Sequence, residues 1–99
     1  MIELTGKQKS KLRSLAMTRP AAFQVGKEGL TPTLLSAIDD FVRKNELVKI
    51  ALLDTAASDF DEVALALSER QIAVVQKIGH TFVGYRPNPK LEKRIELPR

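Results

Sequence analysis

The sequence predicts a single α/β domain in which helices pack against a mostly parallel sheet. Segments with apolar residues at helical spacing alternate along the chain with short apolar runs typical of strands, and this alternation is the main observation behind the prediction. The last two apolar runs are separated by only two residues, which adds one antiparallel strand. Because 99 residues support one hydrophobic core, we expect one domain with the order α-β-α-β-α-β-β.

A basic helix is predicted at the start of the chain. Thr5 provides the N-cap, and Gln8 completes a capping box, so the helix should run from there to about Met17. Leu12, Leu15 and Ala16 form its apolar stripe. The basic residues flank this stripe and should face water: Lys7, Lys9, Lys11 and Arg13.

A short strand and a second helix should follow. Residues 21–25 are a short run that predicts a strand ending before Gly26. Thr31 is the expected N-cap of the helix, with Pro32 at the first helical position, where its missing N–H costs nothing. The helix should end near Asn45, and its buried stripe should consist of Leu34, Leu35, Ile38, Phe41 and Val42.

The middle of the chain predicts a central strand and a third helix. Residues 47–53 are nearly all apolar, as in a strand covered on both faces. Two capping boxes offer an N-cap for the third helix: Ser58 with Asp61, or Asp59 with Glu62. The helix should close near Arg70, and its buried stripe should be Phe60, Val63, Ala64 and Leu67.

The last part of the chain predicts a hairpin and a basic tail. Residues 72–78 and 81–85 should form two strands joined by a type II′ turn at Gly79-His80. Among the aromatic residues, we expect only Tyr85 to reach the surface with its hydroxyl. Two alternatives remain for residues 87–99: docking on the domain through Leu91, Ile95 and Leu97, or a flexible tail.

The composition is that of an ordinary globular domain, with 43% apolar and 28% charged residues. The chain has no cysteine, which excludes disulfides, thiolate metal sites and thiol nucleophiles and fits a reducing compartment. We therefore expect a cytoplasmic protein. We expect neither export nor membrane insertion, because the N-terminus does not read as a signal peptide and no apolar stretch has the length of a membrane span.

The net charge of +4 is unevenly distributed along the chain. Residues 1–29 carry six Lys/Arg against two Asp/Glu, residues 30–69 carry three against eight, and residues 70–99 carry seven against two. A fold that gathers the two basic ends on one face would show the electrostatic footprint of a nucleic-acid binder. The alternative is chance clustering on an ordinary solvated surface.

Gly26, Lys27, Glu28 and Gly29 form a Gly-x-x-Gly segment between a predicted strand and a predicted helix. Glycines without a Cβ let a ligand backbone come close, and the N-terminus of the helix together with Lys27 favours a phosphate. The residue order excludes a nucleotide P-loop, in which the lysine follows the second glycine. A simple βα turn is the alternative explanation for both glycines.

We find no combination of residues that predicts an enzyme, a metal site or a cofactor site. His80 is the only histidine and is expected to be solvated at the hairpin tip. Asp39 and Asp40 are about 100° apart on a helix, so they cannot face one substrate and are expected to be surface charges. The carboxylates at the start of the third helix suit capping: Asp59, Asp61 and Glu62.

Five segments, in order, resemble the CRM domain (the chloroplast RNA splicing and ribosome maturation domain) in its single-domain bacterial, YhbY-like form. They are KQKSKLRSLA in the first helix, the strand after Pro20, then VGKEGLT, NELVKI and KIGHTFVGYRP. The resemblance covers nearly the whole chain. It implies a four-stranded mixed sheet with three helices, similar to the C-terminal domain of bacterial translation initiation factor 3, and it implies RNA binding.

The resemblance also implies which residues contact RNA: the GxxG loop of Gly26, Lys27, Glu28 and Gly29, the first-helix residues Lys7, Lys9, Lys11 and Arg13, and Arg86. Glu28 would repel a phosphate unless it turns outward or pairs with a base, so the helix must contribute to affinity. We expect a non-enzymatic monomer that binds ribosomal RNA of the assembling large (50S) subunit, without a cofactor, metal or membrane. The alternative is a protein-interaction module that docks an acidic partner through the basic first helix.

Overall fold

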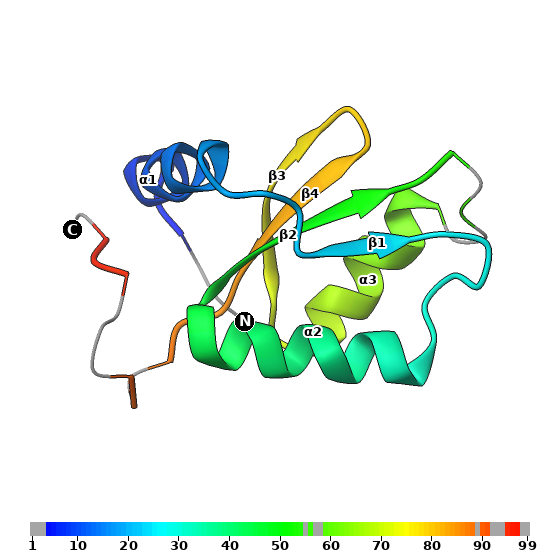
Figure 1. Ribbon diagram of the computed structural model, residues 1–99. Coiled ribbons are helices and arrows are strands. Elements are labelled where there is room, and N and C mark those ends of the chain that lie inside the picture. The colour runs from blue at the N-terminus through cyan, green and yellow to red at the C-terminus, as the bar shows by residue number, and fades with distance from the viewer. Residues whose placement is uncertain (1–3, 55, 57–58, 89, 92–94, 98–99) are drawn as a thin grey trace.

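The computed structural model describes residues 4–54, 56, 59–88, 90–91 and 95–97 of the chain. These described residues form three helices and four strands in the predicted order α-β-α-β-α-β-β (Figure 1). The elements are α1 (Gly6–Met17), β1 (Phe23–Val25), α2 (Pro32–Asn45), β2 (Leu47–Leu52), α3 (Phe60–Glu69), β3 (Ala73–Ile78) and β4 (Thr81–Tyr85).

The four strands form one mixed sheet in the order β1-β2-β4-β3. β4 runs opposite to the other three strands, so one antiparallel strand is present, as predicted. Most of the pairs between neighbouring strands are nevertheless antiparallel, in contrast to a mostly parallel sheet. The hairpin folds β4 back between β3 and β2, so that of the described pairs only β1–β2 is parallel.

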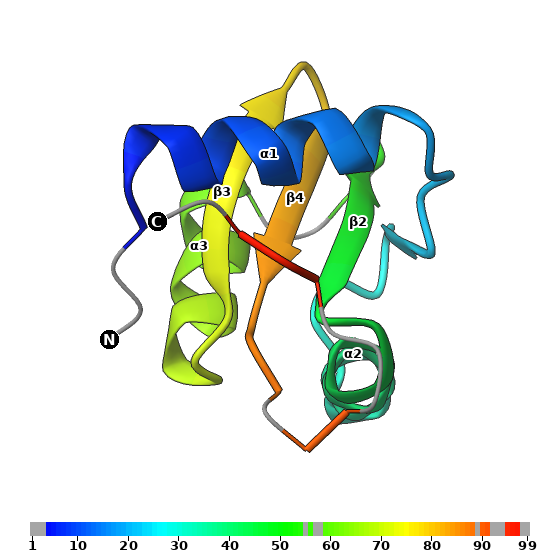
Figure 2. The same cartoon turned by 90° about the vertical axis from the view of Figure 1, so that its left-hand side faces the viewer.

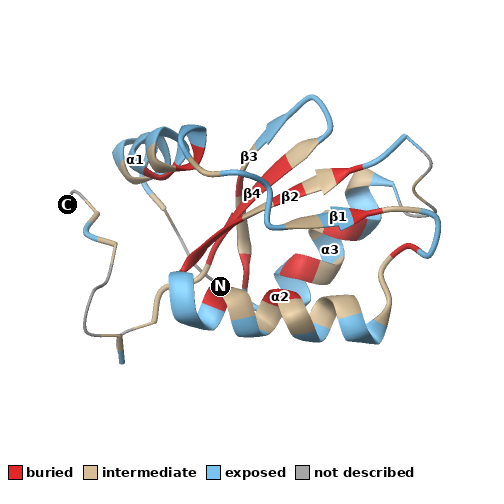
Figure 3. Ribbon diagram, viewed as in Figure 1, coloured by how far each residue is buried: buried red, intermediate tan, exposed pale blue. Residues whose placement is uncertain are grey.

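The sheet is the middle of three layers (Figures 1 and 2). α1 crosses one face, and α2 and α3 cover the other. The larger core lies between the sheet and α2 and α3, and the smaller core lies under α1 and contains Leu12, Ala16, Leu47, Val75, Val83 and Tyr85. Buried residues follow the two central strands β2 and β4, which belong to both cores (Figure 3).

The first two helices begin as the local sequence predicts. Thr5 Oγ1 accepts a hydrogen bond from the Gln8 N–H at 3.2 Å, and Gln8 Oε1 accepts one from the Thr5 N–H at 2.9 Å, which completes the capping box. Thr31 Oγ1 accepts from the Leu34 N–H at 3.1 Å, and Pro32 is the first helical residue of α2.

The third helix and the hairpin turn also follow local signals. Asp59 caps α3, and its Oδ1 accepts from the Glu62 N–H at 2.8 Å. The alternative cap, Ser58, lies outside the described residues. In the hairpin, the positive φ falls on Gly79, at +55°, and not on His80, as a type II′ turn requires.

The strands β1, β2 and β3 are one or two residues shorter than predicted, although sheet hydrogen bonds extend one residue beyond β1 and β2. The Ala22 N–H donates to the Lys49 carbonyl at 2.8 Å just before β1, and the Leu53 N–H donates to the Val25 carbonyl at 2.9 Å just after β2. β3 contains a register shift, a β-bulge, between Val74 and Gln76.

Two predictions of exposure are wrong. Tyr85 is 3% exposed, because β4 is a central strand and this side chain lies in the core beneath α1. Asp39 is not a free surface charge: its carboxylate pairs with Arg70 and Arg86 and its side chain is 30% exposed. Asp40, by contrast, is exposed as expected.

A buried glutamate holds the C-terminal segment against the domain. Glu46 is 1% exposed, and its carboxylate accepts hydrogen bonds from the N–H groups of Asn88 at 2.8 Å and Ile95 at 2.7 Å. Ile95 and Leu97 pack against the core beneath α1, where the segment crosses the sheet (Figure 2). The contacts of the docked alternative are thus present at Ile95 and Leu97, two of the three residues for which they were expected.

Candidate nucleic-acid interface

The GxxG loop joins β1 to α2 through a hydrogen-bonded turn. The Gly29 N–H donates to the Gly26 carbonyl at 2.9 Å, which puts Lys27 and Glu28 at the two corner positions. Gly29 is buried and has φ +68°, a conformation that strongly favours glycine. The βα turn therefore explains Gly29.

The turn does not explain Gly26. Its φ is not positive, and a Cβ added there would make only an ordinary van der Waals contact, 3.5 Å from Cδ1 of Leu53. The fold would accept alanine at this position. An alanine would place its methyl group in ordinary contact with Leu53.

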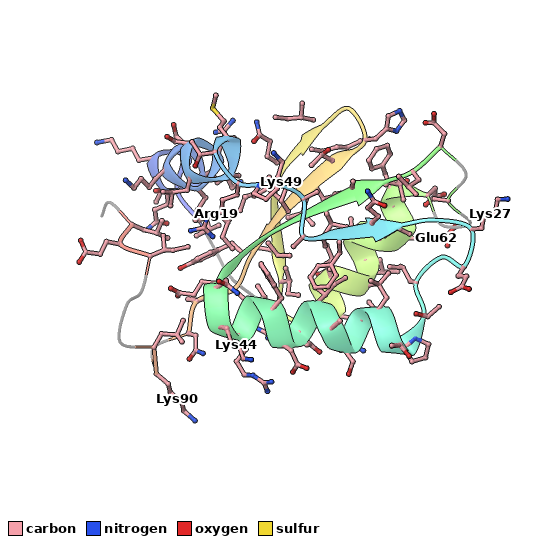
Figure 4. All side chains as sticks on the ribbon, in the orientation of Figure 1. Arg19, Lys27, Lys44, Lys49, Glu62 and Lys90 are labelled. Atoms are coloured by element: carbon pink, nitrogen blue, oxygen red, sulfur yellow. The ribbon has the colours of Figure 1, made fainter. Side chains whose placement is uncertain are left out.

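A pocket of about 340 Å³, the loop pocket, lies beside this turn. It is lined by the four loop residues and by Gln24, Thr31, Leu34 and Leu53. The N-terminus of α2 faces this region, and the dipole and N–H groups of a helix N-terminus favour an anion. Lys27 and Glu28 are both exposed, and Lys27 extends away from the body at the outer end of the molecule (Figure 4).

The four predicted basic residues of α1 are all exposed, because Leu12 and Ala16 turn the opposite side of the helix to the sheet. At about 100° per residue they divide into two flanks. Lys9 and Arg13 lie on the flank that leads to Ala16 and Met17, whereas Lys7 and Lys11 lie on the other flank. The helix thus presents cations on both sides of its buried stripe.

The structure does not bring the loop and α1 together in one pocket. α1 lies over one end of the sheet, whereas the GxxG loop leaves β1 at the opposite end of the molecule (Figure 1). Part of the sheet face on the α1 side lies between them, with exposed side chains at Gln24 and Ile78. The two predicted contact regions are therefore separate, on either side of an open sheet surface.

Arg86 has a different environment from the other predicted contacts. Its Nη1 donates to Asp39 Oδ1 at 3.0 Å and to the Arg70 carbonyl at 2.8 Å, and its Nη2 donates to the Asp39 carbonyl at 3.2 Å. Arg86 thereby ties the end of β4 to α2 and to the end of α3. Its role as an RNA contact stays a prediction, and its guanidinium already has partners within the chain.

The histidine and the acidic residues form no metal cluster within the described part of the chain. His80 is exposed, stacks on Phe60 at a centroid distance of 6.1 Å, and has Nε2 3.4 Å from Asp54 Oδ1. Asp61 and Glu62 lie in the first turn of α3, where they stabilise the helix. None of the described helices is both long and apolar enough to cross a membrane.

A second cavity, which the sequence did not predict, is the sheet groove. It has a volume of about 230 Å³ and lies between the end of α1 and the hairpin. Its lining includes Met17 of α1, Lys49 of β2, Gln76 and Ile78 of β3, and Thr81 and Val83 of β4.

Lys49 is the signal that could have indicated the sheet groove, because it is the one charged residue in the apolar run 47–53. It is half-buried, and its Nζ donates to the carbonyls of Ala16 at 3.4 Å and Arg19 at 3.2 Å. This lysine therefore satisfies carbonyls at the C-terminal end of α1 and fixes the helix beside the groove.

Two bacterial proteins are similar in sequence to this chain over nearly its whole length. "Probable RNA-binding protein YqeI" of Bacillus subtilis (strain 168) is 41% identical over 96 residues, covering 96% of this chain and 99% of the relative. A protein of Haemophilus influenzae named "RNA-binding protein" is 35% identical over 103 aligned positions, covering 100% of this chain and 99% of the relative.

A solved structure has the same fold. The solution structure of SAV1595 from Staphylococcus aureus matches with a TM-score of 0.77 and 43% sequence identity. The match covers 97% of this chain and 100% of the SAV1595 chain. The model of the CRS1 / YhbY (CRM) domain family matches residues 4–86, which include α1, the GxxG loop and the complete sheet. The chain therefore belongs to the CRS1 / YhbY (CRM) domain family.

Proposed function

We propose that this protein binds RNA and associates with ribosomal RNA of the assembling large (50S) subunit, where it takes part in ribosome maturation. It acts as a monomer in the bacterial cytoplasm, without a cofactor and without catalysing a reaction. The names of the relatives support the RNA part of the proposal. The resemblance of the sequence to the ribosome maturation domain supports the ribosomal part.

Gly26 is the observation that carries the proposal. Gly26 has no positive φ and no atom close enough to exclude a Cβ, so the fold does not require glycine there, whereas Gly29 in the same turn has a positive φ. A close approach by a ligand backbone gives Gly26 a reason to lack a Cβ. Lys27 at the adjacent corner and the N-terminus of α2 make that ligand an anion such as an RNA phosphate.

The arrangement of charges supports the same conclusion. The four exposed cations of α1 lie on one side of the sheet, whereas Asp59, Asp61 and Glu62 lie at the start of α3 on the other side. An RNA strand on the α1 side is thereby kept away from these carboxylates. If four to six phosphates are engaged, the logarithm of the binding constant falls with the logarithm of salt concentration at a slope of roughly −3 to −4.

The test is sedimentation of a cell extract that contains the tagged protein, with Lys27→Glu compared with the wild type. Lys90→Glu is the matched control, because Lys90 is also exposed and lies at the opposite end of the molecule from Lys27 (Figure 4). The wild type and Lys90→Glu are expected to travel with large-subunit particles or their precursors. Lys27→Glu is expected to remain in the light fractions.

Two other results would contradict the proposal. If the wild type stays in the light fractions at low salt and its purified form binds no RNA, the protein-interaction alternative with an acidic partner replaces it. If Lys27→Glu and Lys90→Glu both follow the wild type on the particles, the GxxG loop is not the contact with ribosomal RNA.

A further inference from the structure

Four residues, one from each strand, form a row across the uncovered part of the sheet. The register pairs Gln24 with Ala51, Ala51 with Thr81, and Thr81 with Ile78. Paired residues point to the same face, and Val25, the neighbour of Gln24, is in the core with α2 and α3, so this row lies on the α1 side. Gln24 and Ile78 are exposed, and the two central members are half-buried.

This open row joins the two cavities. Gln24 at one end of the row lines the loop pocket, and Ile78 at the other end lines the sheet groove together with its neighbour Thr81. The row spans three intervals between strands, which is about 14 Å at roughly 4.8 Å for each interval. The loop pocket and the sheet groove are therefore the two ends of one continuous surface.

The lining of the sheet groove is suited to an unpaired nucleobase. Met17 and Ile78 supply apolar walls and are 79% and 58% exposed, so they have surface available to cover the face of a base. Gln76, Thr81 and the remaining N–H of Lys49 supply polar groups for its edge. In a duplex that edge is already paired, so the groove favours a single strand.

The charges around the surface fit a strand that carries phosphates. Lys9 and Arg13 lie on the flank of α1 that leads to Ala16 and Met17, and these two residues line the groove. At the other end of the row, Lys27 lines the loop pocket together with Glu28. The described residues that line the groove include no carboxylate. Among the described residues of the C-terminal segment, Ile95 and Leu97 pack against the core beneath α1 and do not line the groove.

We propose that a single RNA strand crosses the open row from the sheet groove to the loop pocket, with one unpaired base lodged in the groove between Met17 and Ile78. The inference rests on the proposed RNA-binding function and deepens it. Met17 and Ile78 hold the base, and the cations at both ends hold the phosphates. The GxxG loop and α1 act on the same strand although they do not touch each other.

The experiment measures binding of a fluorescent single-stranded RNA of mixed sequence by anisotropy over a range of salt concentrations. Met17→Ala and Ile78→Ala are compared with Leu65→Ala, a control on α3 at the opposite face with 61% exposure. Because all three side chains are exposed, urea unfolding should show equal stability. Met17→Ala and Ile78→Ala should each weaken binding about fivefold, the lower range for loss of one stacked base, with the salt slope unchanged.

A strand of the same length with abasic sugars identifies what the groove holds. On this strand, Met17→Ala and Ile78→Ala should bind as well as Leu65→Ala, because no base remains to enter the groove. If the wild type binds RNA and both groove variants match the control on the mixed strand, this inference is overturned and the proposed function stands. Equal losses on the abasic strand also overturn it, whereas absence of RNA binding by the wild type overturns the proposed function itself.

Discussion

Replacing each glycine of the GxxG loop by alanine should separate the requirements of the fold from those of the ligand. In Gly29→Ala, an L residue must adopt φ +68°, which lowers the free energy of unfolding by about 1–2 kcal/mol. In Gly26→Ala, the new Cβ meets only Leu53 at 3.5 Å and φ is not positive. The stability of Gly26→Ala should therefore stay within about 1 kcal/mol of the wild type.

Gly26→Ala, which should leave stability nearly unchanged, should instead weaken the binding of RNA. A phosphate that approaches the backbone at Gly26 accepts charge-assisted hydrogen bonds, each worth about 1.5–3 kcal/mol. Gly26 and Leu53 both line the loop pocket, so a Cβ added at Gly26 beside Leu53 should narrow the pocket and displace the phosphate from one such bond. We expect the affinity of Gly26→Ala for single-stranded RNA to fall roughly 10- to 100-fold.

Urea unfolding followed by circular dichroism gives the stabilities, and fluorescence anisotropy with a labelled RNA gives the affinities. Gly6→Ala is the matched control, since no atom lies within 4 Å of a Cβ built there and the residue is exposed. The reasoning is refuted if Gly26→Ala is destabilised as much as Gly29→Ala. It is equally refuted if folded Gly26→Ala binds RNA as tightly as Gly6→Ala.

The remaining predictions concern contacts that stabilise the fold beneath the proposed RNA-binding surface. Glu46→Ala should lower the free energy of unfolding by about 2–4 kcal/mol in urea, because two N–H groups of the C-terminal segment lose their carboxylate acceptor; an unchanged midpoint would exclude this role. Gly84→Ala puts a Cβ 2.8 Å from Cγ2 of Ile72 and should lower the free energy of unfolding, measured by thermal unfolding, by about 1–3 kcal/mol. A stability equal to that of the wild type would show that the core rearranges to accept the methyl group. Asp39→Asn should cost only about 1 kcal/mol, since its ion pairs are partly exposed, and a double-mutant cycle with Arg86→Ala should give a coupling energy above zero.

The features that the sequence predicts correctly depend on residues close together in the chain. The caps at Thr5 and Thr31 and the glycine-first hairpin turn at Gly79 each need a partner within three residues, so their patterns are visible in the sequence. The exposure of the cations of α1 follows from the apolar stripe of the same helix. The position of the GxxG loop between β1 and α2 follows from the ends of its neighbours.

The features that it does not predict depend on partners far apart in the chain. Asp39 is paired with Arg86 across 47 positions, and Glu46 accepts from Ile95 across 49 positions, so neither contact leaves a local pattern. Tyr85 is buried because β4 is placed inside the sheet, which no turn signal specifies. The sheet groove was missed for the same reason, since three strands and the end of α1 contribute to it.

The bulge in β3 has a consequence for contacts between molecules. β1 and β3 are the two edges of the sheet, and an unpaired edge is a template on which another chain can add a strand. β1 is only three residues long, and the shift between Val74 and Gln76 bends the backbone of β3 out of regular pairing. Two copies that collide therefore meet no long, straight edge among the described strands, and aggregation through a shared sheet is disfavoured.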